Sequence, residues 1–183
     1  IEQGGKPTTM VITCSDLRMS PNELFATNPG ELFILSNVGG LVPKYNAGGI
    51  HGILAAIEYA ITVLEVENIV VLGHAKCGSI QTMMSEKFTT KGGLSESMRT
   101  WLSVAEDART AVKKEMAGKS DEEQQDTCER EAIIISMRNL IAYPYIAKRM
   151  ADNKLNIFGW HFNIASGEIM AYDPTTKFFE PIS

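Results

Sequence analysis

Cysteine is scarce in this chain, and its scarcity removes two classes of protein. Three cysteines occur among 183 residues, an odd number at uneven spacing, which excludes a disulfide scaffold and favours a reducing compartment. No Cys-x-x-Cys sequence is present, and a redox enzyme built on a cysteine pair is therefore disfavoured. The function of the three thiols is thus the first question that the sequence raises.

The chain also lacks excess positive charge and long apolar runs. Seventeen Lys and Arg residues stand against 22 Asp and Glu, a net charge of −5, which is the wrong sign for nucleic acid or anionic membranes as partners. No run approaches the ~18 apolar residues of a membrane span, and residues 1–9 show no targeting pattern. We expect a cytoplasmic location, or an organelle interior if an upstream targeting segment was removed, since the sequence starts at Ile1 rather than Met.

What is present fits one α/β domain over residues 1–183. Hydrophobic residues make up 44% of the chain, enough for a sizeable core. Continuous apolar runs at 9–14, 32–35 and 68–73 predict strands of a mostly parallel sheet that is covered on both faces. A helix of period 3.6 is predicted over 53–64, between the second and third strands.

The second half of the sequence is mainly helical. Helices are predicted over 79–87, over 97–116 with Gly118 as its cap, and from Ser120 or Asp121 through Leu140 to the break at Pro144. Residues 155–164 and 168–172 alternate in the way of a C-terminal hairpin or edge strand added to the sheet.

Polar residues that can bind a metal follow two of the predicted strands. Cys14 ends the first strand, and His74 and Cys77 follow the third. Carboxyl ends of parallel strands lie along one rim, where ligands bind. Two thiolates and one imidazole leave the fourth tetrahedral position of Zn2+ open, as in catalytic sites. The competing interpretation is that each cysteine is a small buried hydrophobic residue.

Asp16 and Arg18 stand on the same face as Cys14 if the segment is extended, and Arg18 can then hold the Asp16 carboxylate by two hydrogen bonds. A surface ion pair worth ~0–1 kcal/mol is the alternative interpretation.

Together these residues resemble the β-class carbonic anhydrases, nearest to the plant-type branch and its bacterial relatives. The resemblance extends over nearly the whole chain. It is carried by Cys14-x-Asp16-x-Arg18, His74-x-x-Cys77, Pro29-Gly30-Glu31-Leu32-Phe33, Asn37-Val38, Leu41-Val42-Pro43, Ala56-Ile57-Glu58-Tyr59-Ala60, Val70-Val71-Leu72-Gly73, Asn139-Leu140 with Tyr143-Pro144, and Gly159-Trp160.

The resemblance implies Zn2+ on Cys14, His74 and Cys77 and the reversible hydration of CO2 to bicarbonate by zinc-bound hydroxide. Two thiolates cancel the charge of the metal, so its surroundings must help it to hold hydroxide. In the family the residue matching Asp16 accepts a hydrogen bond from the zinc-bound water or, in a closed form, becomes the fourth ligand itself. Arg18 would keep Asp16 ionised and aimed.

The resemblance also implies a substrate pocket and an assembly. Phe33, Val38 and Tyr59 would line an apolar CO2 pocket, and the backbone N–H of Gly78 would bind a bicarbonate oxygen. For the three side chains taken singly, core packing is the alternative. Because the family takes some pocket residues from a neighbouring subunit, a homodimer or a higher assembly of dimers is expected.

The chain departs from the family pattern around the substrate rather than at the metal. Gly5 stands where a bicarbonate-binding glutamine is usual, unless Gln3 replaces it through a shifted register. The other departures are Leu17 for serine, Ser36 for arginine, Gly39-Gly40 for Ala-Asn, and Ser79 for the second glycine after the ligand cysteine. We therefore expect an altered bicarbonate site, with a lower rate or a changed substrate.

Two alternatives remain at this stage: a zinc hydrolase acting on carbon disulfide or carbonyl sulfide, and a non-catalytic bicarbonate-sensing zinc protein. Cys128 is interpreted as structural because it has no partner at ligand spacing. His51 and His161 are also interpreted as structural, although either is placed where it could relay protons near the rim.

Overall fold

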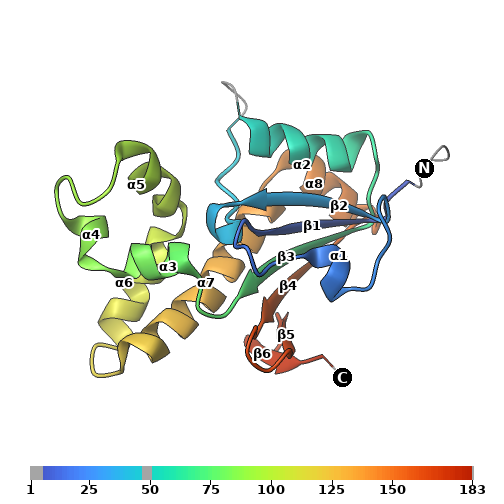
Figure 1. Ribbon diagram of the computed structural model, residues 1–183. Coiled ribbons are helices and arrows are strands. Elements are labelled where there is room, and N and C mark those ends of the chain that lie inside the picture. The colour runs from blue at the N-terminus through green and yellow to red at the C-terminus, as the bar shows by residue number, and fades with distance from the viewer. Residues whose placement is uncertain (1–5, 47–50, 183) are drawn as a thin grey trace.

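A six-stranded sheet of order β2-β1-β3-β4-β5-β6 forms the centre of the computed structural model, which describes residues 6–46 and 51–182 (Figure 1). Strands β1 to β4 are parallel, and β5 and β6 add to one edge in antiparallel fashion. The strands are β1 (Thr9–Cys14), β2 (Leu32–Asn37), β3 (Asn68–His74), β4 (Asn156–Phe162), β5 (Ile169–Asp173) and β6 (Phe178–Pro181). The expected mostly parallel α/β sheet with a C-terminal antiparallel hairpin is confirmed, and β6 is an addition that the sequence analysis did not predict.

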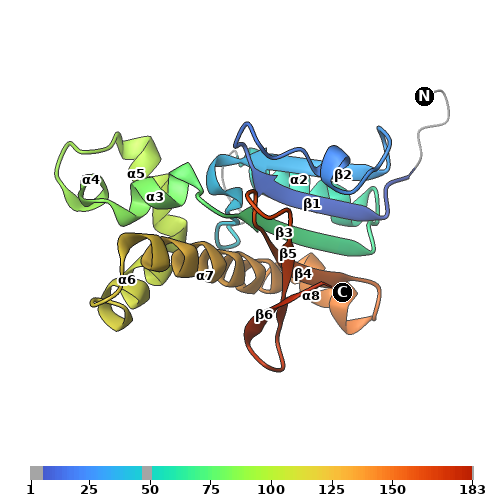
Figure 2. The same ribbon diagram turned by 60° about the horizontal axis from the view of Figure 1, so that its bottom comes forward.

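Some helices pack on the sheet, and others lie beyond the carboxyl ends of the parallel strands (Figure 2). They are α1 (Pro21–Leu24), α2 (Gly52–Thr62), α3 (Gly78–Met84), α4 (Glu86–Thr89), α5 (Glu96–Leu102), α6 (Glu106–Glu115), α7 (Asp121–Ile141) and α8 (Pro144–Ala151), with 3-10 turns η1 (Val38–Gly40) and η2 (Ser103–Ala105). Within the described residues, no helix combines the length and the apolar character that crossing a membrane requires.

Two helix predictions need correction. The helix expected over 79–87 is divided into α3 and α4 at Ser85, which has an extended ψ of 164°. The helix expected over 97–116 is interrupted by η2, where Ala105 takes the non-helical angles φ −108° and ψ 18°. Both Leu102 and Ala105 are fully buried at this break, so the change of direction keeps both helices packed on the same apolar cluster. The second helix ends at Glu115 with Met116 as its cap, and not at Gly118.

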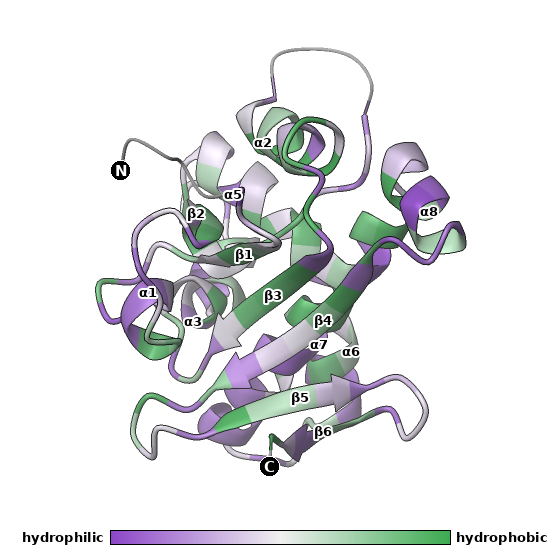
Figure 3. Ribbon diagram, turned by 90° about the vertical axis from the view of Figure 1, so that its right-hand side faces the viewer, coloured by the Kyte–Doolittle hydropathy of each residue, from purple (hydrophilic) through white to green (hydrophobic). Residues whose placement is uncertain are grey.

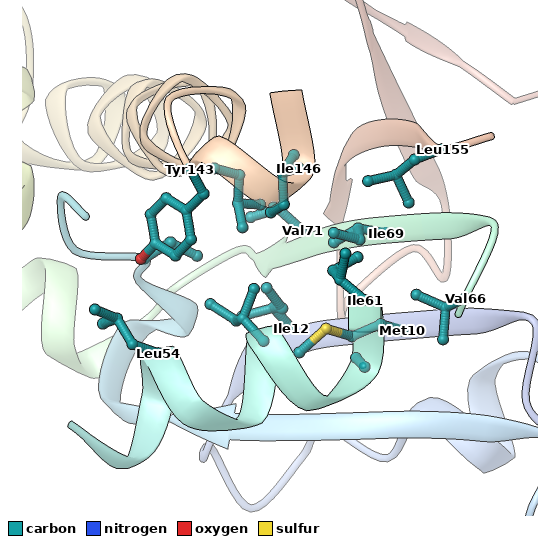
Figure 4. Packing of buried hydrophobic residues seen from close by; sticks show 14 of the residues in the cluster. Met10, Ile12, Leu54, Ile61, Val66, Ile69, Val71, Tyr143, Ile146 and Leu155 are labelled. Atoms are coloured by element: carbon teal, nitrogen blue, oxygen red, sulfur yellow. The ribbon is translucent and has the colours of Figure 1, made fainter. Parts of the chain in front are cut away.

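The alternation of side chains along β1 and β3 explains why both faces of the sheet are apolar. Met10 and Ile12 face the cluster under α2 and α8, whereas Val11 faces the cluster on the side of α1. Figure 4 shows the first cluster, in which β1 and β3 side chains meet those of α2 and α8. Figure 3 shows the same property as hydrophobic colour along β3 and part of β4. Continuous burial of this kind is typical of parallel strands.

Helix α7 reaches from the sheet to the helices beyond its end. A capping box at Ser120 and Glu123 starts the helix, and its middle lies against β3 and β4. The approach is close: a Cβ on Gly159 would lie 2.4 Å from the sulfur of Met137. This packing brings the side chains of the first half of α7 to the ends of the strands.

Candidate metal centre

The three residues that the sequence analysis selected as metal ligands meet at one end of the sheet. Cys14 is the last residue of β1 and His74 the last of β3, and these strands are neighbours in the sheet. Cys77 follows a tight turn in which Lys76 has a φ of 55°, and it caps the start of α3. The Sγ atoms of Cys14 and Cys77 and a ring nitrogen of His74 all lie within 4.8 Å of one another, and all three residues are buried.

The spacing and the free atoms of this group fit a tetrahedral metal. The two sulfurs are 3.9 Å apart, and Zn–S bonds of about 2.3 Å would place two tetrahedral ligands ~3.8 Å apart. His74 Nδ1 lies 3.0 Å from the Ala75 carbonyl oxygen, which fixes the proton on Nδ1. His74 Nε2 is then a lone-pair donor, and within residues 6–46 and 51–182 this buried atom has no hydrogen-bond partner. These donors suit Zn2+, which binds Cys and His.

The two thiols of this group shift each other's pKa in opposite directions. The hydrogen bond from Cys14, opposed by burial and assisted by Ser79, lowers the pKa of Cys77 to about 6. The same contact and burial raise the pKa of Cys14 to about 12. A cation would bind both sulfurs as thiolates, so its binding would release the protons of this pair.

Asp16 and Arg18 form the ion pair that the sequence analysis predicted. Arg18 Nε donates to Asp16 Oδ1 and Arg18 Nη2 to Asp16 Oδ2, each at 2.7 Å. This contact holds the pKa of the Asp16 carboxyl well below its usual range. Asp16 Oδ2 also lies 3.9 Å from His74 Nε2, so the carboxylate faces the metal-binding group while Arg18 holds it.

A small cavity of about 10 Å³, room for about one water molecule, lies beside His74 and Cys77. Its lining residues are Gly39, Gly40, Gly73, His74, Cys77, Ile80, Glu129, Ala132 and Ile133. Phe33, Val38 and Tyr59 are not among them. Phe33 contacts Tyr59, with ring centroids 6.1 Å apart, and Val38 is 39% exposed.

The assignment of Phe33, Val38 and Tyr59 to the substrate therefore stays a prediction. Gly78 lies directly after Cys77, at the start of α3, and its proposed contact with bicarbonate likewise stays a prediction.

Glu129 is a residue of the site that the sequence analysis missed. Its carboxylate is buried on α7, and its Oε1 accepts the backbone N–H of Cys77 at 2.8 Å and Gln125 Nε2 at 2.9 Å. Its Oε2 lies 3.3 Å from Nε2 of His161, which is also buried. A glutamate on the same face of α7 as the buried Ala132 and Ile133 was the available signal. The Glu129 carboxylate, which also lies next to His161, thus fixes the position of the Cys77 backbone N–H.

The remaining residues of interest lie as follows. Cys128 is fully buried on α7, which agrees with its structural interpretation. His51 is exposed and precedes α2. Among the departures, Leu17 is fully exposed, Ser36 is exposed, and Gly39, Gly40 and Ser79 lie near the metal-binding group. Gln3 and Gly5 lie outside the described residues.

Comparison with known proteins links the site to one family. A carbonic anhydrase family model matches residues 9–169. Beta carbonic anhydrase 3 of Arabidopsis thaliana is 37% identical over 161 residues, which cover 88% of this chain and 62% of the relative. A carbonic anhydrase of Synechococcus elongatus is 33% identical over 178 residues, 96% of this chain and 63% of the relative. The chain thus spans about three fifths of the length of these curated relatives.

Solved structures agree with the sequence relatives. The β-carbonic anhydrase CcaA has a TM-score of 0.92 to this structure at 31% identity, covering 99% of this chain and 86% of that chain. A structure from work on two tetrameric β-carbonic anhydrases of Sordaria macrospora has a TM-score of 0.81 at 24% identity, covering 93% of this chain and 82% of that chain. This likeness supports the fold.

Proposed function

The chain belongs to the β-carbonic anhydrase family, and from this premise we propose that it binds Zn2+ through Cys14, His74 and Cys77 and interconverts CO2 and bicarbonate. The observation that carries the proposal is the buried Cys, His, Cys group, which could provide three ligands and whose His74 Nε2 has no hydrogen-bond partner among the described residues. Three protein ligands leave one coordination position for chemistry, as in catalytic zinc sites.

Bound Zn2+ would supply the Lewis acidity that makes water a nucleophile at neutral pH. The residues around it have separate tasks. Glu129 holds the backbone of Cys77, and the Ala75 carbonyl orients the ring of His74. We expect Asp16, kept ionised by Arg18, to accept a hydrogen bond from a water beside His74 Nε2 and so to direct the lone pair of that water toward CO2.

Stopped-flow CO2 hydration on the full chain, measured after metal analysis has established the zinc content, tests this proposal. We expect a hydration rate well above that of the buffer, with about one zinc per chain. A zinc-loaded protein without hydration activity would refute the carbonic anhydrase assignment, and full zinc retention by both Cys14→Ser and Cys77→Ser would refute the ligand set.

We propose further that the chain forms a homo-oligomer built from dimers. Leu17, Val38, Tyr59 and Val63 are all exposed apolar or aromatic side chains, and covering them would stabilise an assembly. The tetrameric enzymes of Sordaria macrospora support such an arrangement in the family. Light scattering coupled to size exclusion should give a mass that is a multiple of two chains, and a monomer at micromolar concentration would contradict it.

A further inference from the structure

The two cysteine sulfurs of the candidate metal centre have different surroundings. Ser79 Oγ lies 2.9 Å from Cys77 Sγ. Cys14 Sγ has no corresponding contact with a hydroxyl among the hydrogen bonds of the described residues. Because a cysteine binds a metal as the thiolate, its sulfur then carries no proton, and the Ser79 hydroxyl must be the donor in this hydrogen bond.

The position of the Ser79 hydroxyl depends on a glycine from another part of the chain. A Cβ built on Gly39 would lie 3.1 Å from Ser79 Oγ, and Gly39 has a φ of 85°. A side chain at 39 would therefore crowd the hydroxyl. The absence of a side chain at Gly39 thus leaves room for the hydroxyl beside the Cys77 sulfur.

We propose that Ser79 is a positioning residue of the metal centre, whose hydroxyl withdraws charge from the Cys77 sulfur in a space that Gly39 leaves open. The inference deepens the proposed function and rests on it, because it assumes a metal on Cys77. Hydrogen bonds to a ligand sulfur weaken its donation to the metal. Ser79 thus offsets part of the charge that two thiolates would otherwise place on the metal and leaves it a stronger Lewis acid.

Cobalt substitution tests the inference without relying on catalysis. Co2+ bound by thiolates absorbs through sulfur-to-cobalt charge transfer, and the energy of that band falls when the sulfur loses a hydrogen bond. We expect the band to move to longer wavelength in Ser79→Ala and Ser79→Gly. Because the sulfur donates more strongly without this hydrogen bond, we expect neither variant to release Co2+ to a chelator more readily than the original protein.

Thr82→Ala is the matched control. Thr82 lies on the same helix, α3, but its hydroxyl donates to the Gly78 backbone carbonyl and not to a ligand. Its band and its cobalt retention should equal those of the original chain. Circular dichroism on each variant verifies folding, and two substitutions at position 79 keep the test available if one of them fails to fold.

Each outcome decides a separate question. If the charge-transfer band of Ser79→Ala is unchanged, the proposed role of the hydroxyl is wrong. The same holds if the band moves only in Ser79→Gly, because glycine in the first turn of α3 would then have changed the helix itself. If the original chain takes up neither Co2+ nor Zn2+, the proposed metal centre is wrong and this inference falls with it.

The link to Gly39 has its own test. Gly39→Ala should lower the urea midpoint more in the original chain than in the Ser79→Gly background, where the hydroxyl is gone. Equal effects in the two backgrounds would contradict the coupling.

Discussion

Arg18 connects two loops of the site through a single guanidinium group. Its Nη2 donates both to Asp16 Oδ2 at 2.7 Å and to the Lys76 carbonyl oxygen at 3.1 Å. Asp16 follows Cys14, and Lys76 precedes Cys77. One side chain therefore sets the distance between the segments that carry the two sulfurs, in addition to keeping Asp16 ionised.

Asp16→Asn should separate metal binding from catalysis. The amide keeps the shape of the carboxylate but loses the negative charge that orients water, so we expect CO2 hydration to fall by about 10²-fold or more while zinc is retained. Stopped-flow kinetics and metal analysis measure the two effects. Glu65→Gln, which alters an exposed carboxylate paired with Lys6, is the control. An unchanged rate in Asp16→Asn would contradict the assigned role.

Cys128 makes stability depend on alkaline pH. Burial, with smaller contributions from Glu129 and Glu131, raises its pKa to about 12, whereas an unfolded thiol titrates near ~8.5. Above that lower value the unfolded state loses its proton first, so stability is full below about pH 8.5 and falls as the pH rises toward 12.

Cys128→Ala tests this dependence through urea midpoints at pH 8 and pH 10.5. Although the variant is destabilised at both values by the lost volume, it should lose less stability between them than the original chain. Equal losses would show that this thiol does not contribute.

At the scale of elements, the boundaries of β1 and β3 were predictable and several connections were not. Apolar runs that stop at Cys14 and His74 mark strand ends, and parallel pairing brings such ends together. The break at η2 and the added β6 depend on packing with distant segments, which local periodicity does not contain. Glu129 was missed because its partner, the Cys77 backbone N–H, becomes visible only when α7 lies against the strand ends.

The turn η1 ties the end of β2 to the candidate metal centre. The side-chain amide of Asn37 spans the turn: its Nδ2 donates to the Leu41 carbonyl oxygen, and its Oδ1 accepts the Leu41 backbone N–H. Gly40 has a φ of 61°, and a Cβ there would lie 3.1 Å from the backbone nitrogen of Cys14. The turn therefore passes directly over the backbone of a proposed ligand.

Gly40→Ala should for this reason both destabilise the fold and loosen the metal. We expect ~1–3 kcal/mol of lost stability from the positive φ and the crowding, with a lower zinc content after dialysis. Gly118→Ala, where a Cβ would meet no atom of the described part of the chain within 4 Å, should change neither measurement. A Gly40→Ala protein with native zinc content and stability would contradict this account of η1.

At the scale of the whole molecule, metal binding and folding should be linked. The proposed ligands come from two strands and a helix start, so only the folded chain brings them together. A ligand at 1,000 times its Kd stabilises the folded state by about 4 kcal/mol, which corresponds to ~8–16 °C in Tm for a chain of this size.

Calorimetry with and without a chelator measures this linkage. Chelation should lower the Tm of the original chain and leave that of Cys77→Ser unchanged. Identical melting curves for the original chain under both conditions would show that no structural stabilisation comes from the metal.

The order of the ligands along the chain has a consequence for synthesis. All three are made by residue 77, whereas Glu129, which anchors the Cys77 backbone, follows 52 residues later. A growing chain thus contains all three proposed ligand residues before α7 and β4 exist to enclose them. Because only the folded chain holds these residues together, stable metal binding should follow the synthesis and folding of the second half of the protein.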